Sequence, residues 1–502
     1  MTQVIHMMTM RCVRGGCALG LAAWVGMGAV ACSEPDPVTP PTARVVASDV
    51  PAIVIDGVFD DWSAIGDGDA LLMADRDYIY ARFLVEGEPA AIQASSRTLA
   101  VMLDIDADPA TGRLRTVDDL PMGVDIEIAY SPREDDGSAG RGVEVVRYDA
   151  DGRAREGSHD VAGAVLAPTY ASRWYELRVE RSAVDRGVGI AAGEVRGAVG
   201  QIGPSGELEG WSVISSAMAP EPRGGTAVAE VALPAKPDGA VRVVAWNVLR
   251  GKPREMTGPF ARVLDALDPD VVLVQEWTVE EDKYLRGWFN ALVPTPTDVG
   301  VWSAMMGEAW GVGVVSPWPT QRVGGEVYAR GGDRATRVVA GVVDSPAGRI
   351  GVASVHLKCC GGANSREDRI RETEAQAINA MLDAAWGDVD VRVVAGDMNL
   401  VGTRGPLDTL RRGLAGDGSD LGIVRAEVLG DGAIYTWWEA GNDFGPGRLD
   451  YVLAGGATVA QAFVLDTSRL GPVSLAEAGL DASDTSASDH LPVVVDLVPM
   501  SR

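Results

Sequence analysis

Short apolar segments, each followed by a polar residue, recur through the second half of this 502-residue chain. Their length and content of Val, Ile and Leu are typical of strands buried on both faces. Helical spacing appears between them, at residues 260–267 and 365–385. Buried strands that alternate with outer helices predict an α/β layered domain. The expected strands cover residues 241–245, 271–274, 311–315, 338–343, 351–355, 391–395, 449–453 and 493–497.

Residues with functional chemistry follow these expected strands. In layered α/β folds, ligand sites collect where the strands end. An Asp or Asn at such a place is often only a turn or cap residue. However, the two histidines of this half, His356 and His490, both fall at strand ends. The strand-end residues, in chain order, are Asn247, Gln275 and Glu276, His356, Asp397 and Asn399, Asp450, and Asp489 and His490.

These motifs, in this order, resemble the endonuclease/exonuclease/phosphatase superfamily, the metal-dependent phosphoesterases related to pancreatic-type deoxyribonuclease. The quoted segments are Trp246-Asn247, Gln275-Glu276, His356, residues 396–399, residues 448–450 and residues 488–490. The resemblance covers residues 241–498. It implies an α/β (α+β) four-layer sandwich, in which two β-sheets pack together and helices lie outside.

The resemblance also implies a metal site. Hydrolysis of a phosphodiester needs about 20 kcal/mol of catalysis, and a cation on the phosphate oxygens supplies part of it. By resemblance, Glu276 is the principal carboxylate for Mg²⁺ (or Mn²⁺), helped by Asn247 and Asp489. Mg²⁺ keeps several waters, so one or two carboxylates suffice to hold it.

The remaining motif residues are implied to act on the phosphate and on water. His490 contacts the scissile phosphate or acts as the base, and Asp450 orients it through a ring N–H. Asp397 and Asn399 align the attacking water, and His356 is a further phosphate donor. Whether Asp397 or His490 removes the proton stays open.

Charge limits the substrate classes. With 44 Lys and Arg against 71 Asp and Glu, the net charge is −27, which excludes a polybasic nucleic-acid binder. Phosphate chemistry on this chain therefore needs a metal. The prediction is an exported phosphodiesterase with a nuclease as first choice. The alternatives are a lipid-headgroup (sphingomyelinase-like) enzyme, an inositol or sugar phosphate phosphatase and, from another class, a catalytically inactive surface binding protein.

The first half of the chain is β-rich. Alternating or β-branched segments at 79–84, 99–105, 124–129, 143–147 and 175–179 predict an all-β sandwich over residues 49–232. Residues 55–62, 78–80, 104–112 and 174–178 resemble the carbohydrate-binding-module-like sandwich of exported bacterial enzymes. That resemblance implies binding or scaffolding, with a glycan as a candidate ligand. Trp62 and Trp174 could stack on a sugar or belong to the core.

An acidic segment lies inside this half. Asp104, Asp106 and Asp108 alternate like the start of a calcium loop. Arg115 stands where an EF-hand would place its bidentate Glu, so the pattern fits either a Ca²⁺ site of another geometry or a solvated turn.

The N-terminus predicts export. Residues 1–31 read as a lipoprotein signal peptide whose end, Gly-Ala-Val-Ala-Cys, resembles a lipobox with Cys32 as the lipidated residue. An ordinary cleaved signal is the alternative. Residues 32–48 form a Pro-rich tether, and residues 233–240 link the sandwich to a catalytic domain at 241–502.

Export also fixes the expected partners and cysteine chemistry. We expect an outer-membrane lipoprotein, at the cell surface or in the periplasm, that touches the membrane only through its lipid. No obligate protein partner is indicated. After maturation only Cys359 and Cys360 remain, as a vicinal disulfide or as two thiols.

Overall fold

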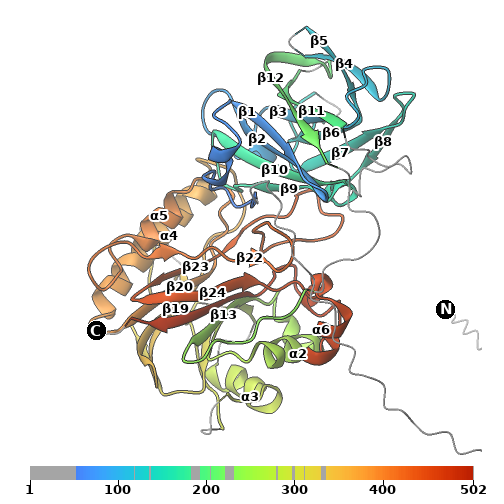
Figure 1. The fold of residues 1–502 in the computed structure, drawn as a ribbon. Helices are drawn as coiled ribbons and strands as arrows, with labels where there is room; N and C mark the ends of the chain where they lie inside the picture. The colour runs from blue at the N-terminus through green and yellow to red at the C-terminus, as the bar shows by residue number, and fades with distance from the viewer. Residues whose placement is uncertain are drawn as a thin grey trace, which may run out of the picture. The chain divides into compact units, whose positions relative to one another are not determined.

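A computed structural model describes most of the chain after residue 52 (Figure 1). The expected signal peptide, Cys32 and the whole expected tether lie outside the described residues, so these expectations stay predictions. Within the described part, no helix has the length and hydropathy needed to cross a lipid bilayer. The described residues are 53–117, 119–134, 137–181, 193–203, 205–220, 231–278, 281–296, 300–309, 311–329 and 335–500.

The first half is an all-β sandwich, as the sequence predicts. An antiparallel sheet of order β1-β2-β10-β9 faces a second sheet of order β12-β11-β3-β6-β7-β8. Apolar side chains of both sheets, such as Phe83, Val101, Ile128 and Leu177, form a common core. The strands are β1 (Ala70–Ala74), β2 (Tyr78–Leu84), β3 (Thr98–Asp104), the separate hairpin β4 (Arg113–Val117) and β5 (Leu120–Val124), β6 (Ile126–Tyr130), β7 (Val143–Tyr148), β8 (Ala154–Gly157), β9 (Val165–Ala167), β10 (Trp174–Glu180), β11 (Gly193–Ile202) and β12 (Leu208–Ala219).

Two strand predictions in this half need correction. The expected strand at 124–129 is divided at Asp125, where β5 ends and β6 begins. The sequence pattern also missed the long β11–β12 hairpin, because glycines at 193, 197 and 200 interrupt the apolar alternation of β11.

The second half has the expected four layers. One sheet has the order β15-β16-β14-β13-β25-β24-β22, and the other has the order β17-β18-β19-β20-β23-β21. Their inner faces share an apolar core that includes Val243, Leu273, Val352 and Val393. The strands are β13 (Val241–Asn247), β14 (Val271–Trp277), β15 (Ser303–Met306), β16 (Gly311–Ser316), β17 (Thr320–Val323), β18 (Arg337–Ser345), β19 (Gly348–His356), β20 (Val391–Asp397), β21 (Gly422–Ile423), β22 (Glu427–Val428), β23 (Asp450–Gly455), β24 (Ala457–Val464) and β25 (Val493–Pro499).

Helices cover the two outer faces (Figure 1). On the β19–β20 sheet, α4 buries Ala375, Ile378 and Leu382. Its start was predictable, since the Ser365 hydroxyl accepts a hydrogen bond from Asp368 N as an N-cap. The helices are α2 (Thr257–Leu267) and α3 (Asp282–Leu292) on the β13–β14 sheet, α4 (Arg366–Ala385) and α5 (Gly405–Arg411) on the other, and α6 (Pro472–Ala478).

Candidate active site

Four polar residues form one row across the second sheet. In the strand register, Arg337 of β18 pairs with His356 of β19, His356 with Asp397 of β20, and Asp397 with Asp450 of β23. Residues in one row of a sheet project from the same face. The fold therefore brings together residues that are separated by more than a hundred positions in the chain.

The other sheet reaches the same point through Asn247. This residue ends β13 and is fully buried. Its Nδ2 donates to Asp397 Oδ2 at 3.1 Å and lies 3.4 Å from Glu276 Oε1. Asn247 thus joins the two carboxylates that the sequence assigned to water activation and to metal binding.

The backbone of β14 is irregular at Glu276. The pairing of β14 with β16 shifts register between Val274 and Trp277, and Glu276 has a φ of 60°. The backbone of Gly311 lies across it, where an added Cβ would come within 3.3 Å of Glu276 Cα. Such strained conformations persist when the surroundings fix them, and they cluster at functional sites. The side chain is held by Arg250, whose N–H donates to Oε2 at 2.9 Å.

His490 and Asp450 form a close pair. Asp450 Oδ2 lies 2.7 Å from His490 Nδ1, and both side chains are buried. The other ring nitrogen, Nε2, lies 3.8 Å from Asp397 Oδ2. Asp450 is itself fixed at the backbone, because its N–H donates to Thr436 Oγ1 at 2.8 Å.

Asp489 is held by a tryptophan. Trp437 Nε1 donates to Asp489 Oδ2 at 3.2 Å, and Trp438 N donates to the Asp489 carbonyl at 2.9 Å. Oδ1 of Asp489 is buried and has no hydrogen-bond partner in the described part of the chain, and the same is true of Asp450 Oδ1. The site therefore holds carboxylate oxygens to which no group of the described residues donates a hydrogen bond.

The electrostatics of the buried groups favour a charged His490. Burial acts to lower the pKa of His490, but the Asp450 and Asp397 carboxylates raise it by more than burial lowers it, so the net shift of the pKa is upward. Burial raises the pKa of Asp397, His490 acts against this shift, and Asp450 adds to it. The Asp397 carboxylate also accepts a hydrogen bond from Asn399 N at 2.9 Å.

His356 is a neutral imidazole in this arrangement. Burial lowers its pKa well below the ordinary value, and Arg337 lowers it further. An Arg guanidinium can only donate, so Nδ1, 3.0 Å from Arg337 Nη1, accepts the hydrogen bond. The ring hydrogen is then on Nε2, which lies 3.4 Å from Asp397 Oδ2.

Seven of the eight site residues expected in this half thus lie in one connected network, and Asp489 adjoins it as the chain neighbour of His490. Asn399 completes it, with a φ of 48° and its Nδ2 donating to Leu357 O at 3.2 Å. Sequence reasoning missed two contributors. Arg337 was not among the expected site residues, and its guanidinium bonds His356. Thr436 carried no signal, since a single Thr in a loop has no distinctive spacing.

The sandwich contacts the loop that carries Trp437 and Trp438. Asp160 accepts hydrogen bonds from Trp438 Nε1 at 3.3 Å and from Gly441 N at 2.9 Å. Thr169 Oγ1 donates to Leu400 O at 2.8 Å, next to Asn399. Two active-site loops are therefore supported from the first half of the chain.

The acidic segment of the sandwich is organised differently from the sequence expectation. Ligand atoms of Asp104, Asp106 and Asp125 lie within 4.8 Å of one another, and no other such group of three occurs among the described residues. Asp108 is not in this group. Its Oδ1 accepts a hydrogen bond from Ala110 N at 2.9 Å in the following turn.

The two tryptophans considered for sugar stacking have other contacts. Trp62 is fully buried, and its Nε1 donates to Glu176 Oε2 at 2.8 Å. The guanidinium of Arg82 lies 4.7 Å from the centre of the Trp174 ring and covers one of its faces. Neither ring supports the glycan ligand that the sandwich resemblance implied.

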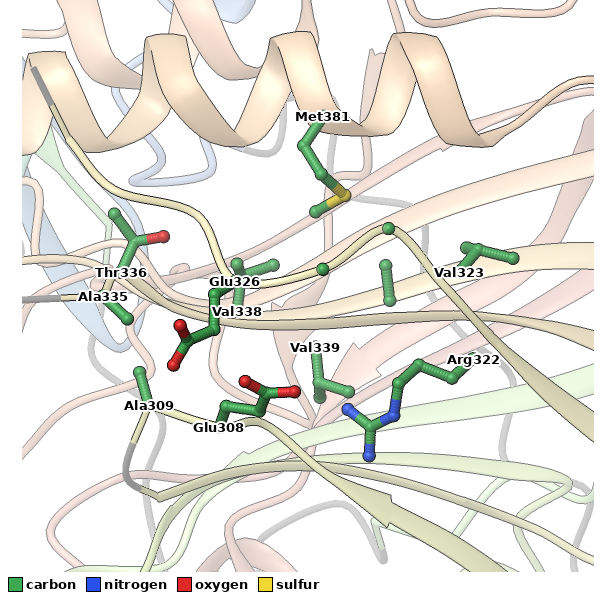
Figure 2. Close-up of a pocket in the computed structure, with 13 residues that line it drawn as sticks. Glu308, Ala309, Arg322, Val323, Glu326, Ala335, Thr336, Val338, Val339 and Met381 are labelled. Carbon is green, nitrogen blue, oxygen red and sulfur yellow. The ribbon is translucent and has the colours of Figure 1, made fainter.

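Two further features lie outside the catalytic network. Figure 2 shows a small pocket between β17, β18 and α4 whose wall includes Glu308, Glu326, Arg322 and Met381 and none of the predicted site residues. In the loop after β19, the thiols of Cys359 and Cys360 are unlinked, with their Sγ atoms 2.9 Å apart.

Comparison with known proteins agrees with the sequence motifs. The sequence model of the Endonuclease/Exonuclease/phosphatase family matches residues 244–490. No curated protein sequence matches this chain significantly.

Solved structures that match this chain include two nucleases and a sphingomyelinase. They are an AP endonuclease from Archaeoglobus fulgidus (15% identity, covering 51% of this chain and 98% of that one, TM-score 0.34), a 3'-5' exonuclease from Neisseria meningitidis (19%, 51% and 99%, 0.36) and sphingomyelinase C from Streptomyces griseocarneus (17%, 51% and 99%, 0.32). Residues 244–490 of this chain thus match the Endonuclease/Exonuclease/phosphatase family in sequence, and the two packed sheets with outer helices are the fold that the motif resemblance implied.

Proposed function

We propose that this protein is an exported, divalent-metal-dependent phosphodiesterase, with a nucleic-acid phosphodiester as its first candidate substrate. The observation that carries the proposal is the convergence on Asp397 of Asn247, His356 and His490, at 3.1, 3.4 and 3.8 Å. Hydrogen-bond donors thus surround the buried Asp397 carboxylate, and such an arrangement can bind a water molecule beside a phosphate group.

The donor set fits a hard cation. Glu276 and Asp489 offer carboxylate oxygens and Asn247 offers one amide oxygen, and the buried Oδ1 of Asp489 lacks a hydrogen-bond donor among the described residues. Mg²⁺ or Mn²⁺ prefers such ligands and completes its shell with water. When bound, the ion would polarise a phosphoryl oxygen and offset the charge that develops there.

His490 serves as a cation and hydrogen-bond donor. Asp450 accepts from Nδ1, so Nε2 is directed toward Asp397 with its proton in place. A ring protonated at neutral pH can donate to a phosphoryl oxygen or to the leaving oxygen, and it cannot take a proton from water.

Asp397 is therefore the favoured base. Burial raises the pKa of this carboxyl, which brings it closer to neutral pH and makes it a better proton acceptor. Asn399 N holds Oδ1, and Oδ2 faces the donors of the site. The neutral Nε2–H of His356 orients the same carboxylate.

Hydrolysis of bis-(p-nitrophenyl) phosphate by the purified protein tests the chemistry. We expect a requirement for Mg²⁺ or Mn²⁺, and loss of turnover in Asp397→Asn and His490→Gln with unchanged far-UV circular dichroism. Retained turnover in both variants would contradict the assignment. No turnover in the wild type with any metal would favour the binding-protein alternative.

A substrate panel then separates the remaining choices. Plasmid DNA, RNA, sphingomyelin and inositol phosphates are each offered to the wild type and to Asp397→Asn. We expect Asp397-dependent cleavage of a nucleic acid. Cleavage of sphingomyelin or an inositol phosphate alone would overturn the nuclease choice and retain the phosphoesterase mechanism.

Export and lipid attachment at Cys32 are part of the same proposal, supported by the lipobox-like end of the signal segment. Cells that express the full chain should incorporate labelled palmitate into it. Cys32→Ala should lose the label and leave the membrane fraction. An unlabelled wild type would reduce the segment to an ordinary cleaved signal.

A further inference from the structure

Three aspartates meet in the sandwich, far from the phosphodiesterase site in the chain. Asp104 is the last residue of β3, Asp106 follows in the loop, and Asp125 stands between β5 and β6. One ligand oxygen from each lies within 4.8 Å of the others. A Ca²⁺–oxygen bond is about 2.4 Å long, so two ligands of one ion can be up to about 4.8 Å apart. The spacing is that of a shared cation.

The buried carboxylate of Asp104 has one oxygen without a hydrogen-bond donor. Asp104 is 0% exposed, and although Oδ2 accepts from Gly123 N at 3.1 Å, Oδ1 has no hydrogen-bond partner among the described residues. The cation opposite in register, Arg196, directs its guanidinium to Glu194 at 3.4 Å. A buried, charged carboxylate with one oxygen that accepts no hydrogen bond is costly unless a positive charge pairs with it.

Electrostatics point the same way. Burial raises the pKa of Asp104 to about 6, the Gly123 N–H acts against it, and the carboxylates of Asp125 and Asp106 raise it further. The neighbouring negative charges repel one another in this geometry, and a divalent cation between them would remove the repulsion.

The backbone around the cluster is closely built. A Cβ on Gly123 would come within 2.3 Å of the carbonyl oxygens of Asp108 and Thr111. Gly112 has a φ of 66°, and a Cβ there would lie 2.4 Å from Val124 O and 3.1 Å from Asp125 Oδ1. Only glycine lets the loop press this closely against the β5–β6 junction.

We propose that Asp104, Asp106 and Asp125 bind a calcium ion that ties the end of β3 to the β5–β6 junction. All donors are oxygen, and neither His nor Cys belongs to the group, which favours a hard cation. Ca²⁺ accepts irregular sets of six to eight oxygens, so three carboxylates on separate segments suit it better than Mg²⁺, which demands near-octahedral geometry. The site does not depend on the proposed phosphodiesterase function.

Calcium binding by the full chain tests the site. The protein is freed of metal and titrated with Ca²⁺ in saturating Mg²⁺, so that any Mg²⁺ site in the catalytic domain is already filled. We expect one Ca²⁺ per chain by calorimetry, a higher Tm with Ca²⁺, and Tb³⁺ luminescence that Ca²⁺ displaces. A wild type that takes up no Ca²⁺ beyond Mg²⁺ would overturn the proposal.

Variants distinguish the ligand set seen in the structure, which includes Asp125, from the set expected from sequence, which includes Asp108. Asp125→Asn and Asp106→Asn should weaken Ca²⁺ at least tenfold and abolish the Tm rise. Asp108→Asn, which keeps an acceptor for Ala110 N, and the exposed Asp151→Asn should behave as the wild type. Because Asp106 is exposed, its variant keeps the core intact and decides the matter if Asp125→Asn does not fold. Equal Ca²⁺ affinity in Asp106→Asn and Asp108→Asn would contradict this ligand set.

Discussion

The Asp450 Oδ2 and His490 Nδ1 atoms lie 2.7 Å apart, although the two residues belong to different sheets. Asp450 begins β23 of one sheet, and His490 precedes β25 of the other. Trp246 holds the backbone of His490, because its Nε1–H donates to the His490 carbonyl oxygen at 2.9 Å. The imidazole therefore has one orientation and one accepting partner, as in other His–carboxylate couples.

Asp450→Asn should move the alkaline limb of the pH–rate profile. The Asp450 and Asp397 carboxylates raise the pKa of His490, so removing one lowers that pKa, and the protonated ring is lost at lower pH than in the wild type. We expect kcat at neutral pH to fall by about 100- to 10,000-fold. Rates on bis-(p-nitrophenyl) phosphate across pH check both effects. Asp420→Asn, at an exposed loop of the same domain, serves as the control, and an unshifted limb in Asp450→Asn would contradict the couple.

Glu176 should make the stability of the sandwich depend on pH. It is buried and accepts hydrogen bonds from Gly57 N and Trp62 Nε1, yet burial raises its pKa to about 8. The folded state then binds the proton more tightly than the unfolded chain. The stability that this proton contributes is fully present below the unfolded pKa, near 4.5, and is lost as pH rises through about 8.

Urea unfolding of Glu176→Gln checks the sign. The free energy of unfolding of the wild type relative to this variant should decrease between pH 5 and pH 9. Glu86→Gln, at an exposed position of the same sandwich, should differ from the wild type by the same amount at both pH values. A relative stability of the wild type that increases with pH would show that Glu176 is stabilised as an anion.

The sequence made the convergence of the catalytic residues predictable because the strands carry their own markers. An apolar run that ends in His356 or Asp397 indicates both a strand and the edge at which it ends. Parallel neighbours then place such residues side by side, as β19 and β20 do. The helical spacing at residues 365–385 likewise predicted α4 to within one residue at its start, because local spacing determines a helix.

Contacts that depend on register or on distant loops could not be read in this way. Asp104, Asp106 and Asp108 look equivalent in an extended chain, but the turn after Asp106 carries Asp108 away, and Asp125 arrives from another strand. His159 carries no sequence mark of burial, yet it is 1% exposed. Its neighbour Asp160 bonds a loop 278 residues further on, which no local pattern records.

Asp160→Ala should lower the catalytic rate, although Asp160 lies in the sandwich and outside the candidate active site. The substitution removes the acceptor of Trp438 Nε1 and Gly441 N, and each lost hydrogen bond costs about 1 kcal/mol. Because the adjacent Trp437 holds Asp489, we expect kcat to fall by about tenfold or more as the loop moves. Asp151→Ala, in an exposed turn of the same sandwich, is the matched control. Equal rates in the two variants would show that the loop holds its position without the sandwich.

Glu276→Gln should separate metal binding from folding. Glu276 is kept in a left-handed backbone conformation, and Arg250 N and Asn247 Nδ2 already contact its two oxygens. Gln keeps the shape and one acceptor but removes the charge, so protein stability should change little. The metal should bind more weakly, by at least about tenfold, as expected when a ligand shell is disturbed.

Two measurements on Glu276→Gln distinguish this from a structural defect. The Mg²⁺ concentration for half-maximal rate should rise, and Mn²⁺ binding followed by electron paramagnetic resonance should weaken in parallel. Glu255→Gln changes an exposed carboxylate that pairs with Lys252 and should leave both values unchanged. If Glu276→Gln lowers kcat while Mn²⁺ binds as in the wild type, the metal is held by other residues, and Glu276 acts on the substrate instead.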